Sequence, residues 1–281
     1  MTFGPLVSCE ELAQHLTDAD WLVLDCRHEI ADPQKGVRAY SEGHIPGAFH
    51  AHVDRDLSGP VGDGHKGRHP LPLPGAFPRF LGDRGVGPAT KIVVYDDVAG
   101  QWASRAWWLA RHHGHANVAL LDGGLTRWKA LKSPLRAGHE KPRKSTTFAG
   151  SPGKMPTTDA GAIAAGGITL LDARAPERYR GEVEPVDKRA GHIPGARSAP
   201  LAGNVGADMR FLPPAELRKR FEAVAPAGGP VACYCGSGVT STQIILAMEI
   251  AGLPTPALYP GSWSEWSWPD AKRPIATGPE P

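Results

Sequence analysis

The strongest constraint on the fold is an internal repeat. Four sequence blocks of the first half return in the same order in the second half, at offsets between 138 and 148 residues. The blocks are 22–27, 42–48, 92–97 and 122–128, and their counterparts are 169–174, 190–196, 230–235 and 260–266. Blocks repeated in order indicate a duplication, and a period this long indicates two domains rather than a solenoid. The length of 281 residues agrees with two domains.

A polar stretch separates the two copies. Residues 139–156 contain several Gly and Pro residues and show no sustained apolar period, which is typical of a linker. We therefore expect a first domain over 1–138, a linker over 139–156 and a second domain over 157–281.

The composition excludes several classes of protein. Hydrophobic residues make up 41% and charged residues 21% of the chain, which is typical of a globular protein. The net charge is +2 with both signs mixed, so we expect neither a nucleic-acid nor a membrane partner. No signal peptide or membrane-spanning apolar run is visible. Four cysteines are too few for a disulfide scaffold and lack metal-ligand spacing, so we expect a soluble cytoplasmic protein with reduced thiols and no metal.

Short apolar runs alternate with helical patterns in both copies. The runs 21–25, 91–95, 168–172 and 230–234 predict buried strands, and 103–113 and 240–251 predict helices. This alternation predicts an α/β fold with a mainly parallel sheet flanked by helices in each half. In such sheets, ligands bind beyond the carboxyl ends of the strands.

The loop after the strand 230–234 carries the most reactive candidate residue, Cys235. Gly236 and Gly238 allow backbone N–H groups to turn inward around one atom, and the following helix adds its positive dipole end. Both effects lower the pKa of a thiol and stabilise an added anionic sulfur. The alternative is a small buried core residue. A phosphatase loop is excluded, because it requires Arg where Ser241 stands.

The duplication also assigns residues to structural roles. We align Cys235 with Asp97 of the first copy, where a carboxylate cannot accept sulfur, so we expect the first domain to be catalytically silent. Cys26 aligns with Ala173 and is expected in the core, as is Cys233. The paired histidines and tryptophans of the repeated blocks, His44 with His192 and Trp128 with Trp266, are expected to be structural.

These motifs together resemble the tandem-domain rhodaneses, and within them the 3-mercaptopyruvate sulfurtransferases. The resemblance rests on two Asp-x-Arg strands, two His-Ile-Pro-Gly-Ala motifs, a silent first loop and two Gly-x-x-x-x-Trp motifs. It implies two tandem rhodanese-like domains, the second catalytic. The loop resembles the mercaptopyruvate type, because thiosulfate-using relatives carry basic residues directly after the cysteine. Its residues are Cys235, Gly236, Ser237, Gly238, Val239 and Thr240.

The resemblance also implies how the donor is held. It points to Arg178 as the substrate-binding arginine, which can clamp one carboxylate through two hydrogen bonds. A second basic contact lies some ten residues further on in the family. Asp187 falls at that position in this chain, which leaves Lys188 or Arg189 for the role.

A proton relay is implied as well. By resemblance, Ser237 neighbours the nucleophile, His69 polarises this serine, and Asp54 orients the histidine. The alignment before His69 is open, so His65 is an alternative.

The resemblance implies a ping-pong sulfurtransferase without cofactor or metal. Cys235 would take sulfur from 3-mercaptopyruvate, release pyruvate and pass the persulfide sulfur to cyanide or to a thiol acceptor such as thioredoxin. One alternative is a thiosulfate:cyanide sulfurtransferase, and another is a non-catalytic persulfide carrier or binding module. The oligomeric state stays open.

Overall fold

A computed structural model describes residues 3–61, 65–225 and 228–281. The chain divides into two compact units. The first consists of Met1–Gly59, Pro72–Met155 and Gly206–Phe211, and the second of Pro60–Leu71, Pro156–Val205 and Leu212–Pro281. The short segment 60–71 therefore belongs to the second unit, although it lies in the first half of the sequence.

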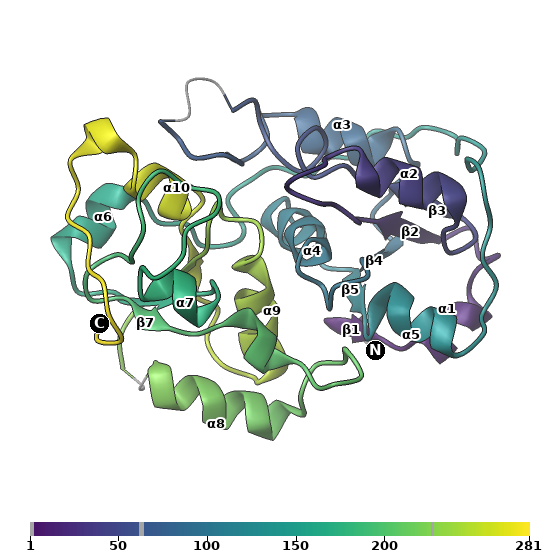
Figure 1. Cartoon of the computed structure of the whole chain (residues 1–281). Helices are drawn as coiled ribbons and strands as arrows, with labels where there is room; N and C mark the ends of the chain where they lie inside the picture. The colour runs from purple at the N-terminus through teal and green to yellow at the C-terminus, as the bar shows by residue number, and fades with distance from the viewer. Residues whose placement is uncertain (1–2, 62–64, 226–227) are drawn as a thin grey trace. The chain divides into compact units, whose positions relative to one another are not determined.

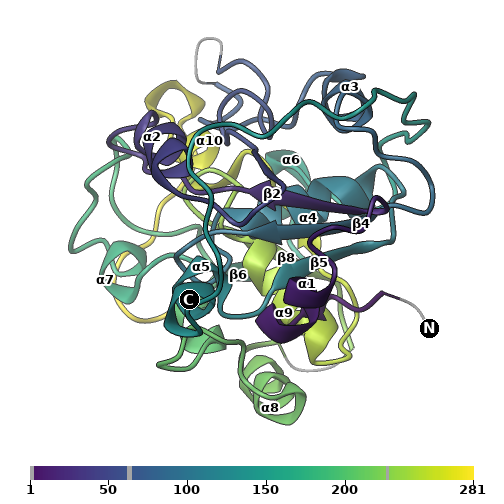
Figure 2. The same cartoon turned by 90° about the vertical axis from the view of Figure 1, so that its right-hand side faces the viewer.

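In the described part of the first unit, the core is a five-stranded parallel sheet in the order β1-β5-β4-β2-β3. Its strands are β1 (Leu6–Val7), β2 (Trp21–Asp25), β3 (Ala48–His50), β4 (Lys91–Tyr95) and β5 (Val118–Leu121). Its helices are α1 (Cys9–Gln14), α2 (Lys35–Glu42), α3 (Ala76–Gly82), α4 (Ala103–His112) and α5 (Gly124–Ala130). The central strands read as continuous apolar runs because helices bury both faces of such a sheet. Figure 2 shows β2, β4 and β5 side by side, and α4 packs on β4 and β5.

The second unit repeats this plan with a four-stranded parallel sheet among its described residues, in the order β7-β6-β8-β9. Its strands are β6 (Thr169–Asp172), β7 (Arg197–Ser198), β8 (Val231–Tyr234) and β9 (Ala257–Leu258). Its helices are α6 (Ala160–Ala165), α7 (Pro176–Tyr179), α8 (Pro214–Val224), α9 (Thr242–Ile250) and α10 (Ser262–Trp266), with 3-10 turns η1 (Leu201–Asn204) and η2 (Pro269–Ala271). Helix α9 packs on β8 and on α8. Figure 1 shows α8 below α9. The predicted α/β class is thus confirmed in both units.

The repeated Asp-x-Arg blocks form the same buried ion pair in each unit. Arg27 donates from Nη2 to Oδ2 of Asp25 (2.6 Å) and to the Gly43 carbonyl (2.8 Å). Arg174 does the same with Asp172 (2.6 Å) and with the Gly191 carbonyl (2.7 Å). The charges are satisfied locally, which makes the repeated block a structural element.

The other structural expectations hold as well. His44 and His192 each place Nδ1 2.8 Å from a main-chain carbonyl oxygen, and both rings are fully buried. The other residues expected in the core are also buried: Cys26, Cys233, Trp128 and Trp266. The predicted strands and helices agree with the observed ones to within two residues at their ends. Among the described residues, no helix is long and apolar enough to cross a membrane.

The strand register corrects one expectation. Asp25 is paired in register with Tyr95, and Asp172 with Tyr234. Both tyrosine hydroxyls also accept an N–H from the isoleucine of the repeated His-Ile-Pro-Gly block, at 3.2 Å in each unit. The two tyrosines are therefore equivalent, and the equivalent of Cys235 is Asp96 rather than Asp97. The ungapped alignment of the apolar runs was wrong by one residue, a shift that moves every side chain of a strand to its other face.

Candidate active site

Cys235 is the first residue after β8 and is buried. Its backbone is held from both sides: its N–H donates to Oγ of Ser262 (3.2 Å), and its carbonyl accepts the N–H of Trp263 (3.0 Å). The thiol therefore lies at the carboxyl end of a parallel strand, where this kind of sheet binds ligands.

The loop wraps hydrogen-bond donors around the sulfur. Gly238 donates its N–H to Sγ of Cys235 (3.2 Å). Gly238 has φ +77°, and a Cβ there would lie 2.4 Å from the Pro260 carbonyl oxygen, so only glycine fits. Burial opposes ionisation of Cys235, but hydrogen bonds from the Thr240 hydroxyl and the Ser237 N–H lower the pKa of its thiol from the ordinary value. The loop therefore supplies hydrogen-bond donors around the sulfur, as the sequence predicted, and the nucleophilic role of Cys235 stays a prediction.

This lowered pKa predicts selective alkylation of Cys235. Because its folded-state pKa lies below that of an ordinary thiol, its thiolate fraction rises at a lower pH and alkylation follows. Burial raises the pKa of the other cysteines, that of Cys9 to about 11. Iodoacetamide labelling at varied pH, read for each cysteine by mass spectrometry, should therefore give an inflection at a lower pH for Cys235 than for the other three cysteines and for a cysteine in an unfolded peptide. Thr240→Ala should raise the inflection and Thr240→Ser preserve it; a wild-type inflection at or above that of a cysteine in an unfolded peptide would refute the prediction.

Ser237 lies beside His69 in the same unit. Nδ1 of His69 is 2.7 Å from Oγ of Ser237, and both side chains are buried. The alternative, His65, is exposed and lies against the Trp268 ring, with centroids 5.0 Å apart. The structure thus brings together the predicted serine and the first of the two candidate histidines.

Close packing seats the segment that carries His69. Gly67 has φ +85°, and a Cβ on it would lie 2.6 Å from the Gly261 carbonyl oxygen. The next residue, Arg68, donates its N–H to Oγ of Ser264 (3.1 Å). A larger residue at Gly67 would push both Arg68 and His69 away from the Cys235 loop.

Two guanidinium groups lie at Gly236, next to the thiol. A Cβ placed on Gly236 would lie 2.9 Å from Nη2 of Arg68 and 3.7 Å from Nη1 and Nη2 of Arg178. Arg178, at the end of α7, is the arginine that the resemblance singled out. Arg68 was missed, although its place directly before a candidate histidine was a usable signal. Two guanidiniums at the residue that follows the thiol can bind a small anion.

The remaining predicted basic residues have contacts elsewhere. Nζ of Lys188 lies over the Trp268 ring, 4.3 Å from its centroid. Arg189 donates from Nη1 to the Arg273 carbonyl (3.3 Å). A role for Lys188 or Arg189 in substrate binding stays a prediction. Val239 is fully buried, and its carbonyl accepts the Thr242 hydroxyl (2.6 Å), so it shapes the loop through its backbone.

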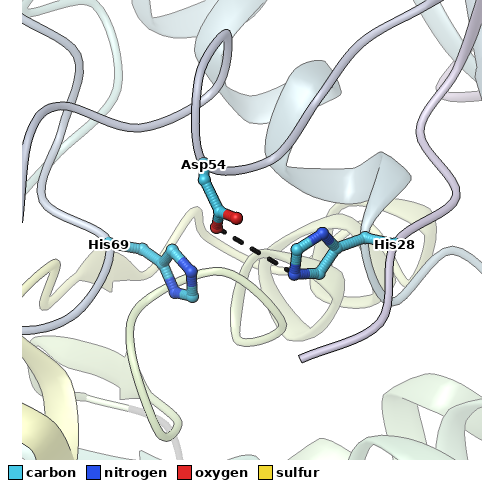
Figure 3. Close-up of side chains that lie close together, drawn as sticks. All are labelled: His28, Asp54 and His69. Carbon is cyan, nitrogen blue, oxygen red and sulfur yellow. Dashed lines mark ion pairs between the residues drawn. The ribbon is translucent and has the colours of Figure 1, made fainter. Parts of the chain in front are cut away.

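Asp54 belongs to the first unit. Its carboxylate is 4.0 Å from Nε2 of His28 and 4.0 Å from Nδ1 of His52, and its own N–H donates to that same His52 nitrogen (3.2 Å). Figure 3 shows the pair of Asp54 with His28. Its predicted role as the carboxylate that orients His69 stays a prediction.

In the corresponding loop of the first unit, the carboxylate of Asp96 accepts the backbone N–H groups. Asp96 is buried, and Oδ1 accepts the N–H groups of Val98 (2.9 Å) and Gly100 (2.8 Å). Oδ2 accepts those of Trp102 (2.8 Å) and Ala103 (2.9 Å), where α4 begins. The donors that would surround an anionic sulfur are thus used internally. The catalytic silence of the first domain stays a prediction, and this use of the donors by Asp96 supports it.

The family of the chain follows from comparison with known proteins. A model of the rhodanese-like domain matches twice, over residues 8–131 and 159–267. The chain belongs to the rhodanese family. Both units are rhodanese-like domains, each with a parallel sheet flanked by helices.

Individual relatives of this rhodanese cover nearly its whole length. A Pseudomonas aeruginosa protein named as a probable 3-mercaptopyruvate sulfurtransferase is 47% identical over 99% of this chain and 100% of its own. A Mycobacterium tuberculosis protein named provisionally as the thiosulfate sulfurtransferase SseB is 38% identical, with 97% of each chain covered. The solved structure of the Escherichia coli 3-mercaptopyruvate sulfurtransferase SseA matches with a TM-score of 0.81 at 28% identity, over 92% of this chain and 99% of that chain.

Proposed function

We propose that this rhodanese is a 3-mercaptopyruvate sulfurtransferase with Cys235 as its nucleophile. The observation that carries the proposal is the Cys235 thiol, which lies in a loop of hydrogen-bond donors with two guanidiniums at the adjacent Gly236. A relative of that name at 47% identity supports the choice of donor.

The first half-reaction transfers the donor's sulfur. Arg178 and Arg68 bind the carboxylate of 3-mercaptopyruvate, and the Cys235 thiolate attacks its sulfur. A sulfur–sulfur bond forms while the carbon–sulfur bond breaks, and its electron pair leaves as the enolate of pyruvate. The donor's thiol proton passes by way of Ser237 and His69 to the enolate carbon, which completes pyruvate and leaves Cys235 as an anionic persulfide.

The second half-reaction regenerates the thiolate. A nucleophile attacks the outer sulfur, the sulfur–sulfur bond breaks, and its electron pair returns to Cys235. Cyanide would leave as thiocyanate, and a thiolate acceptor, such as that of thioredoxin, would leave as its own persulfide. Neither half-reaction requires a cofactor, since no net oxidation of the enzyme occurs over the cycle.

A comparison of donors tests the proposal. On one preparation, kcat/KM is measured with 3-mercaptopyruvate from pyruvate release and with thiosulfate from sulfite release, each with cyanide as acceptor. We expect a preference for 3-mercaptopyruvate and a mass gain of one sulfur atom on Cys235 when acceptor is omitted. A clear preference for thiosulfate would favour the thiosulfate sulfurtransferase reading, which the M. tuberculosis relative's name supports. Release of neither pyruvate nor sulfite would refute both enzyme functions and favour the non-catalytic persulfide carrier.

The contact between Ser237 and His69 predicts a donor-dependent loss of rate. Ser237→Ala and His69→Ala should each lower kcat with 3-mercaptopyruvate by about 10²-fold, because the leaving carbanion needs a proton. With thiosulfate the loss should be less than about tenfold, because sulfite leaves without one. His65→Ala is the matched control and should retain the wild-type rate. Equal losses with both donors would contradict the relay.

A further inference from the structure

Asp187 is a buried carboxylate in the donor site. It lies eight residues after α7, its side chain is 5% exposed, and its N–H donates to Oε1 of Glu184 (3.0 Å). It occupies the position where a second basic contact was expected, so a negative charge stands where a positive one was sought.

The carboxylate of Asp187 joins the two guanidiniums at Gly236. Oδ1 accepts a hydrogen bond from Nη1 of Arg68, and Oδ2 lies 3.4 Å from Nη2 of Arg178. Arg68 thereby directs its other terminal nitrogen, Nη2, toward Gly236. Asp187 thus fixes the guanidinium of an arginine that arrives from a segment 119 residues earlier in the sequence.

Neighbouring ion pairs complete a balanced cluster. Glu184, 4% exposed, accepts from Nη2 of Arg178 through Oε1 (2.6 Å) and lies 3.3 Å from Nη1 of Arg174 through Oε2. The cluster contains the guanidiniums of Arg68, Arg174 and Arg178 and the carboxylates of Asp172, Glu184 and Asp187. Its formal charges cancel, although two of its arginines lie at Gly236.

We propose that Asp187 is a specificity-determining residue that adapts the site to a donor with a single negative charge. The proposal rests on the proposed sulfurtransferase function. 3-Mercaptopyruvate brings one carboxylate to the two guanidiniums, whereas thiosulfate brings two negative charges. Both approach a thiolate, and each additional unit of charge repels more strongly in a buried site than in water. With Asp187 ionised, the cluster supplies no surplus positive charge to offset the second charge of thiosulfate.

Removing this charge should shift the choice of donor. Asp187→Asn keeps the shape of the side chain and leaves the cluster with one surplus positive charge. The ratio of kcat/KM for thiosulfate to kcat/KM for 3-mercaptopyruvate should rise by about tenfold, since the dianion gains twice the attraction of the monoanion. An equal change with both donors, which leaves the ratio as in the wild type, would show that Asp187 only holds Arg68 and would overturn the proposal.

Two further variants separate charge from position. Asp187→Glu keeps the charge and should keep the wild-type ratio even if both rates fall. Arg68→Met combined with Asp187→Asn restores the original sum of charges and should return the ratio toward that of the wild type. A double variant that retains the raised ratio would contradict the electrostatic argument.

A binding measurement separates failure of this inference from failure of the proposed function. Protection of Cys235 from iodoacetamide by pyruvate, a monoanion, and by sulfate, a dianion, requires no turnover. In Asp187→Asn, protection by sulfate should strengthen by about tenfold relative to protection by pyruvate. Inactivity with both donors would refute the proposed function, while protection would still decide the role of Asp187. Turnover with an unchanged protection ratio would refute the role of Asp187 alone.

Discussion

Cys235→Ser should abolish sulfur transfer, with pyruvate release from 3-mercaptopyruvate falling by at least about 10⁴-fold. Serine is nearly isosteric and can accept the Gly238 N–H that now reaches Sγ. Its hydroxyl does not ionise near neutral pH and cannot hold sulfur as a persulfide, so the loop stays folded while the covalent intermediate is lost. The measurements are pyruvate release and the mass of the protein after incubation with the donor alone.

Cys26→Ala is the matched control for this variant. Cys26 is fully buried in the first unit, and its N–H donates to the Tyr95 carbonyl as that of Ala173 donates to the Tyr234 carbonyl. Alanine therefore already serves at the equivalent position. We expect wild-type turnover and a normal gain of one sulfur atom. Pyruvate release by Cys235→Ser at the rate of this control would remove Cys235 from the mechanism.

The second large effect is expected in the Asp96 loop of the first unit. Asp96→Ala should lower the free energy of unfolding of the first unit by about 3–5 kcal/mol, because three buried N–H groups and one part-buried N–H group lose their acceptor at once. Asp96→Asn keeps one of the two oxygen acceptors and should cost about 1–3 kcal/mol. Urea unfolding followed by hydrogen exchange of peptides from β4 and α4 reports on this unit separately.

Asp97→Ala is the control next in the chain. Asp97 is exposed, and its loss should change the free energy of unfolding by no more than about 0.5 kcal/mol. Equal destabilisation by Asp96→Ala and Asp97→Ala would contradict the role of the Asp96 carboxylate as acceptor of the loop N–H groups. It would also contradict the equivalence of Asp96 to Cys235.

Local sequence patterns predicted much of the fold. The apolar runs at 21–25 and 91–95 become β2 and β4 because a strand covered on both faces needs continuous apolar residues, and this requirement is visible in sequence. The turn around Cys235 could also be predicted from its glycines, since the conformational freedom of glycine is an intrinsic property. The exact register of β4 was not, because an apolar run permits a one-residue shift that only hydrogen-bond partners such as Tyr95 resolve.

The charged side chains of the site were harder to predict. Arg68 and His69 lie in a segment without apolar periodicity, so nothing local shows where that segment packs. Its position depends on the contact of Gly67 with Gly261, far away in the sequence. In the sequence, Asp187 stands where a basic residue was expected. Its role could not be predicted, because it depends on the ion pair with Arg68, which comes from a distant segment.

The sequence by itself determined two α/β domains and assigned the reactive thiol to the second, because periodicity, turn residues and the repeat are local properties. Only the tertiary structure decided which side chains lie at the Cys235 loop. His69 reaches Ser237 across 168 residues of sequence, and Arg68 reaches Asp187 across 119. Contacts over such separations depend on how the loops pack. The net charge of the proposed donor site depends on which charged side chains these contacts bring together.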